Sequence, residues 1–182
     1  MIAKLQQSTV VLLGLLLVGV APAWAGSAAG LSWTAPSGWK SEGPRPMRAA
    51  TYTIAAAPGD AEGGECVVNY FGAGQGGGVD ANVKRWIGQF QAPGGGPADS
   101  LAKVSKKTVN GVPVTLIDIT GTYLFKPFPM APQATPKPGY RMLAAMAEGP
   151  QGTVFFKFTA PKKTTDAAES QFNGMIDSLK KQ

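Results

Sequence analysis

Residues 103–124 read KVSKKTVNGVPVTLIDITGTYL, two strand-like runs joined by the dipeptide Asn110-Gly111. Asn-Gly between two such runs is the strongest short-range signal for a β-hairpin, because both residues tolerate the positive φ angles of a type I′ turn. A second pair of runs, 140–148 and 153–159, flanks Gly-Pro-Gln-Gly and predicts another hairpin. Consecutive hairpins predict an antiparallel sheet at the centre of the fold.

Two helices are predicted to cover this sheet. Residues 79–90 carry apolar side chains at helical spacing, and so does the C-terminal segment, where Asp166 and Glu169 have the spacing of a capping box. Residues 47–54 and 65–71 are predicted strands. The predicted fold class is α+β, an antiparallel β-sheet of about six strands flanked by two helices. The two apolar stripes consist of Val79, Val83, Trp86, Ile87 and Phe90, and of Ala168, Phe172, Met175, Ile176 and Leu179.

The N-terminal residues 1–25 predict a cleaved secretory signal peptide. Lys4 precedes an unbroken apolar run at 10–20, and Ala23-Trp24-Ala25 supplies a small–x–small cleavage site. The apolar run is shorter than the roughly 20 residues that span a bilayer. We therefore expect a single α+β domain at 26–182, exported to the periplasm or the exterior, with no membrane span after cleavage.

The composition excludes several chemistries. The 182 residues include no histidine, which removes Ser-His-Asp and Cys-His nucleophile pairs and histidine-based metal sites. The acidic residues are scattered and form no calcium-loop pattern, so no metal and no cofactor are expected. A net charge of +6 favours anionic partners, but no motif indicates nucleic-acid binding.

The glycine-rich segment 72–78 raises the question of phosphate binding. Gly72, Gly74 and Gly77 match G-x-G-x-x-G between a predicted strand and a predicted helix. The parallel strand that completes a dinucleotide-binding unit does not follow, since the next segment is the loop PGGGP. We interpret 72–78 as a flexible connection and keep a small-molecule or anion-binding module as an alternative.

A buried carboxylate and a single cysteine are the remaining chemical candidates. Asp118 lies in a strand suited to burial and needs a partner, for which Arg48 or Arg141 qualifies. A structural ion pair is the favoured interpretation, and a carboxylate-based hydrolase that pairs Asp118 with Glu148 is the alternative. Cys66, with no histidine to activate it, is interpreted as a buried inert thiol.

Aromatic and basic residues are candidates for ligand or partner contacts. Trp33 and Trp39, near the N-terminal turn, either line a groove or pack in the core. Lys106 and Lys107 lie on a predicted edge strand, where lysines either prevent edge-to-edge aggregation or bind a polyanion.

The segment 126–139, KPFPMAPQATPKPG, contains five prolines and predicts a stiff, exposed excursion between two strands. Long loops of this kind are often functional. We therefore expect a partner-contact surface here, formed with the apolar side chains Phe125, Phe128 and Met130.

Several segments together resemble a known group of proteins. The sequence is similar to an uncharacterised family of signal-peptide-bearing exported bacterial proteins. More distantly, the opening W-x-x-P-x-G-W, the order of the elements and the end of the last helix resemble the PsbP-like α/β/α sandwich, which implies an accessory or binding protein. The first resemblance is carried by WTAPSGW, MRAATYTI, NVKRWIGQF, PGYRMLAAMAEGP and VFFKFTAP, and the second by W-x-x-P-x-G-W, the order of the elements and Asp177-Ser178-Leu179.

The leading expectation is an exported, non-catalytic binding or accessory protein of unknown ligand. Its partner is expected to be another exported or envelope protein, or an anionic surface. The anion-binding module and the carboxylate-based hydrolase stay open as alternatives.

Overall fold

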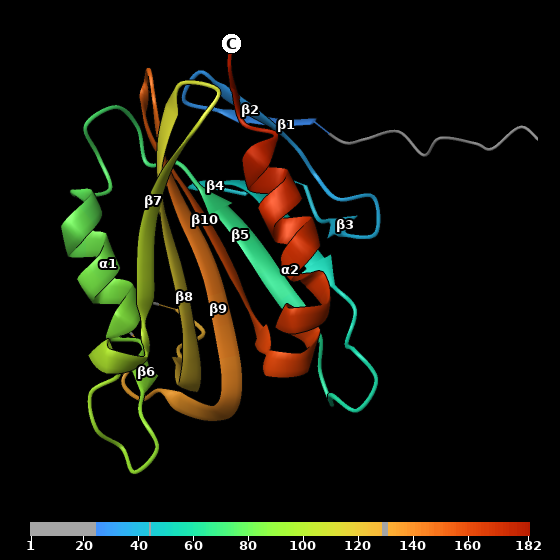
Figure 1. The fold of residues 1–182 in the computed structure, drawn as a ribbon, viewed down its shortest axis with the longest axis vertical. Helices are drawn as coiled ribbons and strands as arrows, with labels where there is room; N and C mark the ends of the chain where they lie inside the picture. Colours follow the sequence, from blue (N-terminus) through green and yellow to red (C-terminus); the bar gives the residue numbers. More distant parts are fainter. Residues whose placement is uncertain (1–24, 44, 129–130) are drawn as a thin grey trace, which may run out of the picture.

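A computed structural model of the protein describes residues 25–43, 45–128 and 131–182 (Figure 1). The predicted signal peptide lies outside the described residues, except for Ala25 at the start of the first strand. Within these residues, none of the helices has the length and apolar character needed to cross a membrane.

The described chain alternates strands with two α-helices and one 3₁₀ turn. In order these are β1 (Ala25–Ala28), β2 (Leu31–Thr34), β3 (Lys40–Ser41), β4 (Arg48–Ile54), β5 (Gly64–Asn69), α1 (Val79–Ile87), β6 (Phe90–Gln91), the 3₁₀ turn Asp99–Leu101, β7 (Lys103–Val109), β8 (Val112–Phe125), β9 (Thr135–Gly149), β10 (Gly152–Pro161), α2 (Lys162–Asp177) and β11 (Lys180–Lys181). The α+β class with two helices is therefore confirmed.

The strands form two sheets with antiparallel pairing. The large sheet has eight strands in the order β3-β4-β5-β10-β9-β8-β6, with β7 also paired to β8. A three-stranded sheet places β2 between β1 and β11. The predicted number of about six strands is too low, because β3, β6 and β11 have two residues each. A strand of two residues has no side-chain alternation that a sequence pattern can reveal.

Both predicted hairpins are present. At the β7–β8 turn, Asn110 and Gly111 have φ angles of 49° and 77°, as a type I′ turn requires. Val109 pairs with Val112 across this turn. The second hairpin joins β9 to β10, where Gly149 pairs with Gly152. The turn residues thus set the register within the two pairs β7–β8 and β9–β10.

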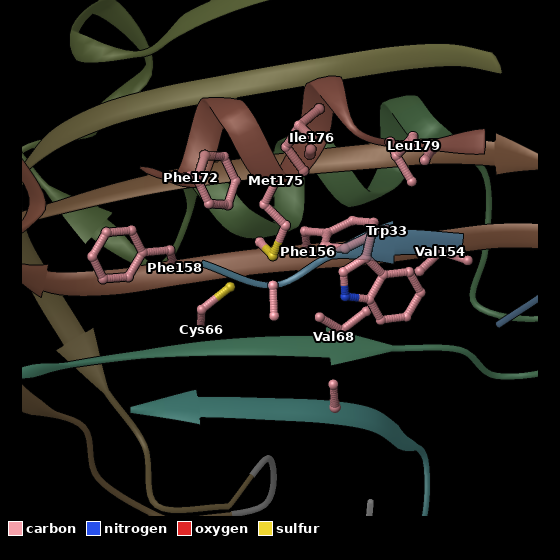
Figure 2. Close-up of a cluster of buried hydrophobic side chains, with 14 of the residues drawn as sticks. Trp33, Cys66, Val68, Val154, Phe156, Phe158, Phe172, Met175, Ile176 and Leu179 are labelled. Carbon is pink, nitrogen blue, oxygen red and sulfur yellow. The ribbon is translucent and has the colours of Figure 1, made fainter. Parts of the chain in front are cut away.

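The helices cover opposite faces of the large sheet (Figure 1). Along β10, Phe156 and Phe158 pack in the core beneath α2, whereas Phe155 packs with the residues of α1 on the other face. Figure 2 shows the α2 side, where helix residues such as Phe172 and Met175 point toward the sheet. The alternation of strand side chains thus divides the apolar residues between two cores.

The start of α2 differs from the prediction. The helix begins at Lys162, so Asp166 and Glu169 lie inside it and do not form a capping box. Both carboxylates instead accept hydrogen bonds from Nη1 of Arg141 on β9, each at 2.7 Å. A long-range ion pair that no local pattern encodes therefore explains this acidic spacing.

The ion pair predicted for Asp118 is confirmed. Nε and Nη2 of Arg141 donate to the two carboxylate oxygens of Asp118 at 2.8 and 2.9 Å. Of the two predicted partners, Arg48 pairs with Glu65 instead. Arg141 therefore ties β8, β9 and α2 together beside the α2-side core.

Candidate binding surface

The hairpin of β8 and β9 extends beyond the neighbouring strand. The partner of Pro161, the last residue of β10, is Tyr140, and β8 and β9 continue past this point to the pair Phe125–Thr135. A register shift between Gly121 and Tyr123 marks the start of the extension. We call residues 121–125 and 135–140 the arm. Residues 135–139 were predicted to belong to an exposed excursion, whereas in the structure they form the start of β9.

Aromatic rings follow the arm from the α1-side core to its tip. The ring of Tyr123 lies 5.2 Å from that of Phe90, 6.0 Å from that of Tyr140 and 6.3 Å from that of Phe125, measured between centroids. Phe125 is 37% exposed and Phe128, three residues further on, is 55% exposed. The apolar surface of the arm therefore begins in the core and ends in solvent.

Lys137 clamps the outer part of the arm to the loop before β5. Its Nζ donates to both carboxylate oxygens of Glu62 at 2.9 and 2.8 Å and lies about 5 Å from the ring centroids of Phe125 and Tyr140. The hydrogen bonds from Lys137 and Tyr140 lower the pKa of Glu62. Burial alone would lower the pKa of Lys137, but the hydrogen bonds to Glu62 and Tyr140 outweigh it and the pKa is raised. The arm is thus held at a fixed position.

Lys157 on β10 holds the inner part of the arm. Its Nζ donates to Oε1 of Gln89, just after α1, and to the hydroxyl of Tyr123 at 3.2 Å. It also lies 5.1 Å from the ring centroid of Tyr123. Burial, with a smaller contribution from Arg85, lowers the pKa of Lys157 to about 8. Lys157 takes part in none of the ion pairs among residues 25–43, 45–128 and 131–182.

The predicted contact residues divide into exposed and buried groups. Phe125, Phe128 and Lys106 are exposed, whereas Met130 lies outside the described residues. Lys107 donates to Asp177 of α2 at 2.6 Å, so its charge is paired. The structure therefore leaves the aromatic pair at the arm as the main candidate surface.

The two tryptophans do not serve as contact residues. Trp33 is 1% exposed and Trp39 is 7% exposed. The indole of Trp33 donates to the hydroxyl of Tyr52 at 3.0 Å and packs edge-on against Phe156, with 5.1 Å between the ring centroids. The indole of Trp39 donates to Gln171 of α2 at 3.0 Å. Their placement as candidate contacts is wrong, because both rings fill the α2-side core.

The glycine-rich segment is tied to the protein core. The side-chain amide of Asn82 donates to the carbonyl oxygens of Gly76 and Gly78, at 2.8 and 3.0 Å. A Cβ atom at Gly76 would lie 2.9 Å from the rings of Phe71 and Phe155. Neighbouring strands pair antiparallel, so the segment does not open a dinucleotide-binding βαβ unit.

The remaining chemical candidates lie apart. Asp118 pairs with Leu143 on β9, five residues before Glu148 on that strand. At the usual strand rise this separation is about 17 Å, so the fold does not bring the two carboxylates together. Cys66 is fully buried, and burial raises the pKa of its thiol. The described residues hold no metal-binding group of three or more Cys, Asp or Glu side chains.

Sequence patterns missed the residues that fix the arm. Lys157 interrupts the apolar run VFFKFTA, and a lone lysine in a predicted buried strand is the one signal that could have identified it. Glu62 lies in a Gly/Ala-rich loop and carries no such signal. Its role depends on a contact with Lys137, which is distant in the sequence.

Comparisons with known proteins bear on the fold. No family model matches the chain, and no curated protein matches it. A solved structure of cyanobacterial PsbP (CyanoP) from Synechocystis sp. PCC 6803 is similar, with a TM-score of 0.50 and 13% sequence identity, covering 93% of this chain and 99% of that chain. The PA94 protein of unknown function from Pseudomonas aeruginosa has a TM-score of 0.48 and 11% identity, covering 89% of this chain and 99% of its own. The chain thus has a fold similar to that of PsbP.

Proposed function

We propose that this protein is an exported, non-catalytic binding or accessory protein and that the arm, with Phe128, is its contact surface. The observation that carries this proposal is the exposure of Phe125 and Phe128 at the end of a clamped hairpin. Exposed aromatic side chains on a rigid support lose little conformational entropy when they are buried against a partner. The clamps at Lys137 and Lys157 supply that rigidity.

Export is the second part of the proposal. It rests on the sequence of residues 1–25, with the cleavage site at Ala23-Trp24-Ala25. N-terminal sequencing of the protein recovered from the envelope or the medium should give Gly26 as the first residue. Recovery of the intact chain from the cytoplasm alone would contradict export without affecting the contact surface.

A photocrosslinking experiment tests the contact surface. A benzophenone side chain in place of Phe128 should give a defined adduct in the producing cell. The control carries the same group in place of Met47, which is 68% exposed on the β3–β4 connection. Adducts that are specific to position 128 support the proposal. Identical adducts at both positions, or neither a protein nor a lipid adduct at position 128, would show that the arm is not the contact surface.

A further inference from the structure

The tip of the arm has an unusual charge pattern. From Ile119 to Ala147 the sequence contains no aspartate or glutamate, and the charged residues are Lys126, Lys137 and Arg141. Lys137 is paired with Glu62, and Arg141 with carboxylates from β8 and α2. Lys126 takes part in none of the ion pairs of the described chain. The tip therefore presents one unpaired positive charge and no negative charge of its own.

Phe125, Lys126, Pro127 and Phe128 are consecutive and all exposed. Two aromatic rings on either side of a lysine suit the interface of an anionic bilayer, where rings enter the boundary between headgroups and acyl chains and the ammonium stays with the phosphates.

Two further features favour a bilayer over a protein pocket. The full sequence carries a net charge of +6, or +5 after loss of Lys4 with the predicted signal peptide, which attracts the protein to anionic surfaces. The clamps at Lys137 and Lys157 also support the arm behind this segment, and Phe128, the more exposed of the two rings, lies beyond both clamps. A membrane needs no shape complementarity to accept such a tip.

We infer that the segment Phe125–Phe128 inserts into the interfacial region of an anionic phospholipid bilayer and so places this protein on a membrane surface. The inference rests on the proposed function, since it names the partner of the same surface. Phe125 and Phe128 supply apolar contact and Lys126 supplies attraction to the phosphates.

The test measures binding to vesicles of mixed phosphatidylglycerol and phosphatidylcholine, and to vesicles of phosphatidylcholine alone. The full chain is used as it is recovered from the producing cell, and all variants share the same N-terminus, so differences among them report on the substituted positions. Phe125→Ser and Phe128→Ser should each weaken binding to the anionic vesicles roughly tenfold. The control Met47→Ser, at a more exposed apolar residue, should bind as the unchanged protein does.

A charge-matched pair separates local from general electrostatics. Lys126→Glu and Lys40→Glu change the net charge equally, and both lysines are exposed. Lys126→Glu should weaken binding by about fivefold or more, with a clearly smaller effect for Lys40→Glu. Equal effects would overturn the inference, because they would show that the vesicles attract the protein through its overall charge and not through Lys126.

Insertion is measured directly with a fluorescent label. Cys66 is the sole cysteine and is fully buried, so a cysteine introduced at Pro127 can be labelled selectively. An environment-sensitive dye at this position should shift to the blue with anionic vesicles, and the same dye at Met47 should not. No shift, or unchanged binding after loss of both rings, overturns the inference. Protein adducts specific to position 128 without vesicle binding would leave the proposed function standing and remove the membrane as its partner.

Discussion

Arg141 on β9 and Asp118 on β8 form a two-point ion pair, with nitrogen–oxygen distances of 2.8 and 2.9 Å. The same guanidinium also binds Asp166 and Glu169 of α2. The side chain of Arg141 is only 10% exposed, so three carboxylates converge on one nearly buried cation. The helix is therefore fixed to the sheet by charge as well as by its apolar stripe.

Replacing Arg141 should be far more damaging than breaking a surface ion pair. Arg141→Ala leaves three carboxylates facing one another, and we expect a loss of about 3 kcal/mol in the free energy of unfolding. Arg45→Ala removes an exposed pair with Glu42 and should cost less than about 1 kcal/mol. Urea denaturation of both variants measures the difference. Equal losses would mean that the network around Arg141 contributes nothing beyond a surface pair.

The pH dependence of Lys157 is a second prediction. Burial lowers its pKa in the folded protein to about 8, from an ordinary value of 10.5. The unfolded chain therefore binds more protons between these values, and the stability of the protein rises with pH through this window. Lys157→Met removes the effect, so its stability relative to the unchanged protein should fall by about 2 kcal/mol between pH 7 and pH 9.5.

Thermal or urea unfolding at several pH values provides the measurement for Lys157. Lys163→Met, which removes an exposed lysine on α2, is the matched control for the loss of one positive charge. A constant difference between Lys157→Met and the unchanged protein across the window would show that Lys157 titrates normally.

Two glycines should respond in opposite directions to alanine. A Cβ atom at Gly174, inside α2, would meet no atom within 4 Å, so Gly174→Ala should stabilise the protein by up to about 1 kcal/mol through helix propensity. A Cβ atom at Gly121 would lie 2.8 Å from the carbonyl oxygen of Gln91 on β6. Gly121→Ala should cost about 1–3 kcal/mol because β6 must shift. The melting temperatures of both variants test these two expectations. A stabilising Gly121→Ala would contradict the close approach of Gly121 to Gln91 at the start of the arm.

The clamp on the arm can be loosened without unfolding the protein. Glu62→Gln removes the charge that holds Lys137, but Glu62 is half-exposed, so we expect little change in global stability. Amide exchange in the arm should become faster, starting at the N–H groups of Thr135, Lys137 and Gly139, while exchange in β10 stays unchanged. Glu42→Gln is the control, at an exposed pair on another loop. Unchanged exchange in the arm would show that Glu62 does not hold it.

The main sheet and the helices could be predicted because their signals are local. Asn110-Gly111 sets a turn by its own backbone preference, and the stripe on α2 follows the helical period. The start of α2 could not be placed in this way. The spacing of Asp166 and Glu169 was interpreted as a helix cap, whereas Asp166 binds Arg141 on β9. Sequence spacing identifies that a carboxylate is present, but only the tertiary fold identifies what it binds.

Only those parts of the candidate site that depend on local sequence could be predicted. Phe128 lies in the proline-rich segment 126–139 that was predicted to be exposed, Phe125 immediately precedes it, and both are exposed. The tryptophans of the N-terminal turn have equally ambiguous local surroundings. Trp33 is buried because β2 lies against α2 and the large sheet, an arrangement set by β1 and β11 at distant parts of the chain. The clamps at Lys137 and Lys157 likewise join segments that are far apart in the sequence.

The small sheet brings both ends of the described chain to one strand. Ala25 pairs with Thr34, and Lys181 pairs with Leu31, so β2 is held on both sides by terminal strands (Figure 1). A mechanical force applied between residues 26 and 182 would therefore load β1 and β11 first. The two ends lie at opposite ends of β2, so the load would run along these short strands before it reached the eight-stranded sheet and the arm. The small sheet thus lies between the two ends of the described chain and the candidate binding surface in the path of an applied force.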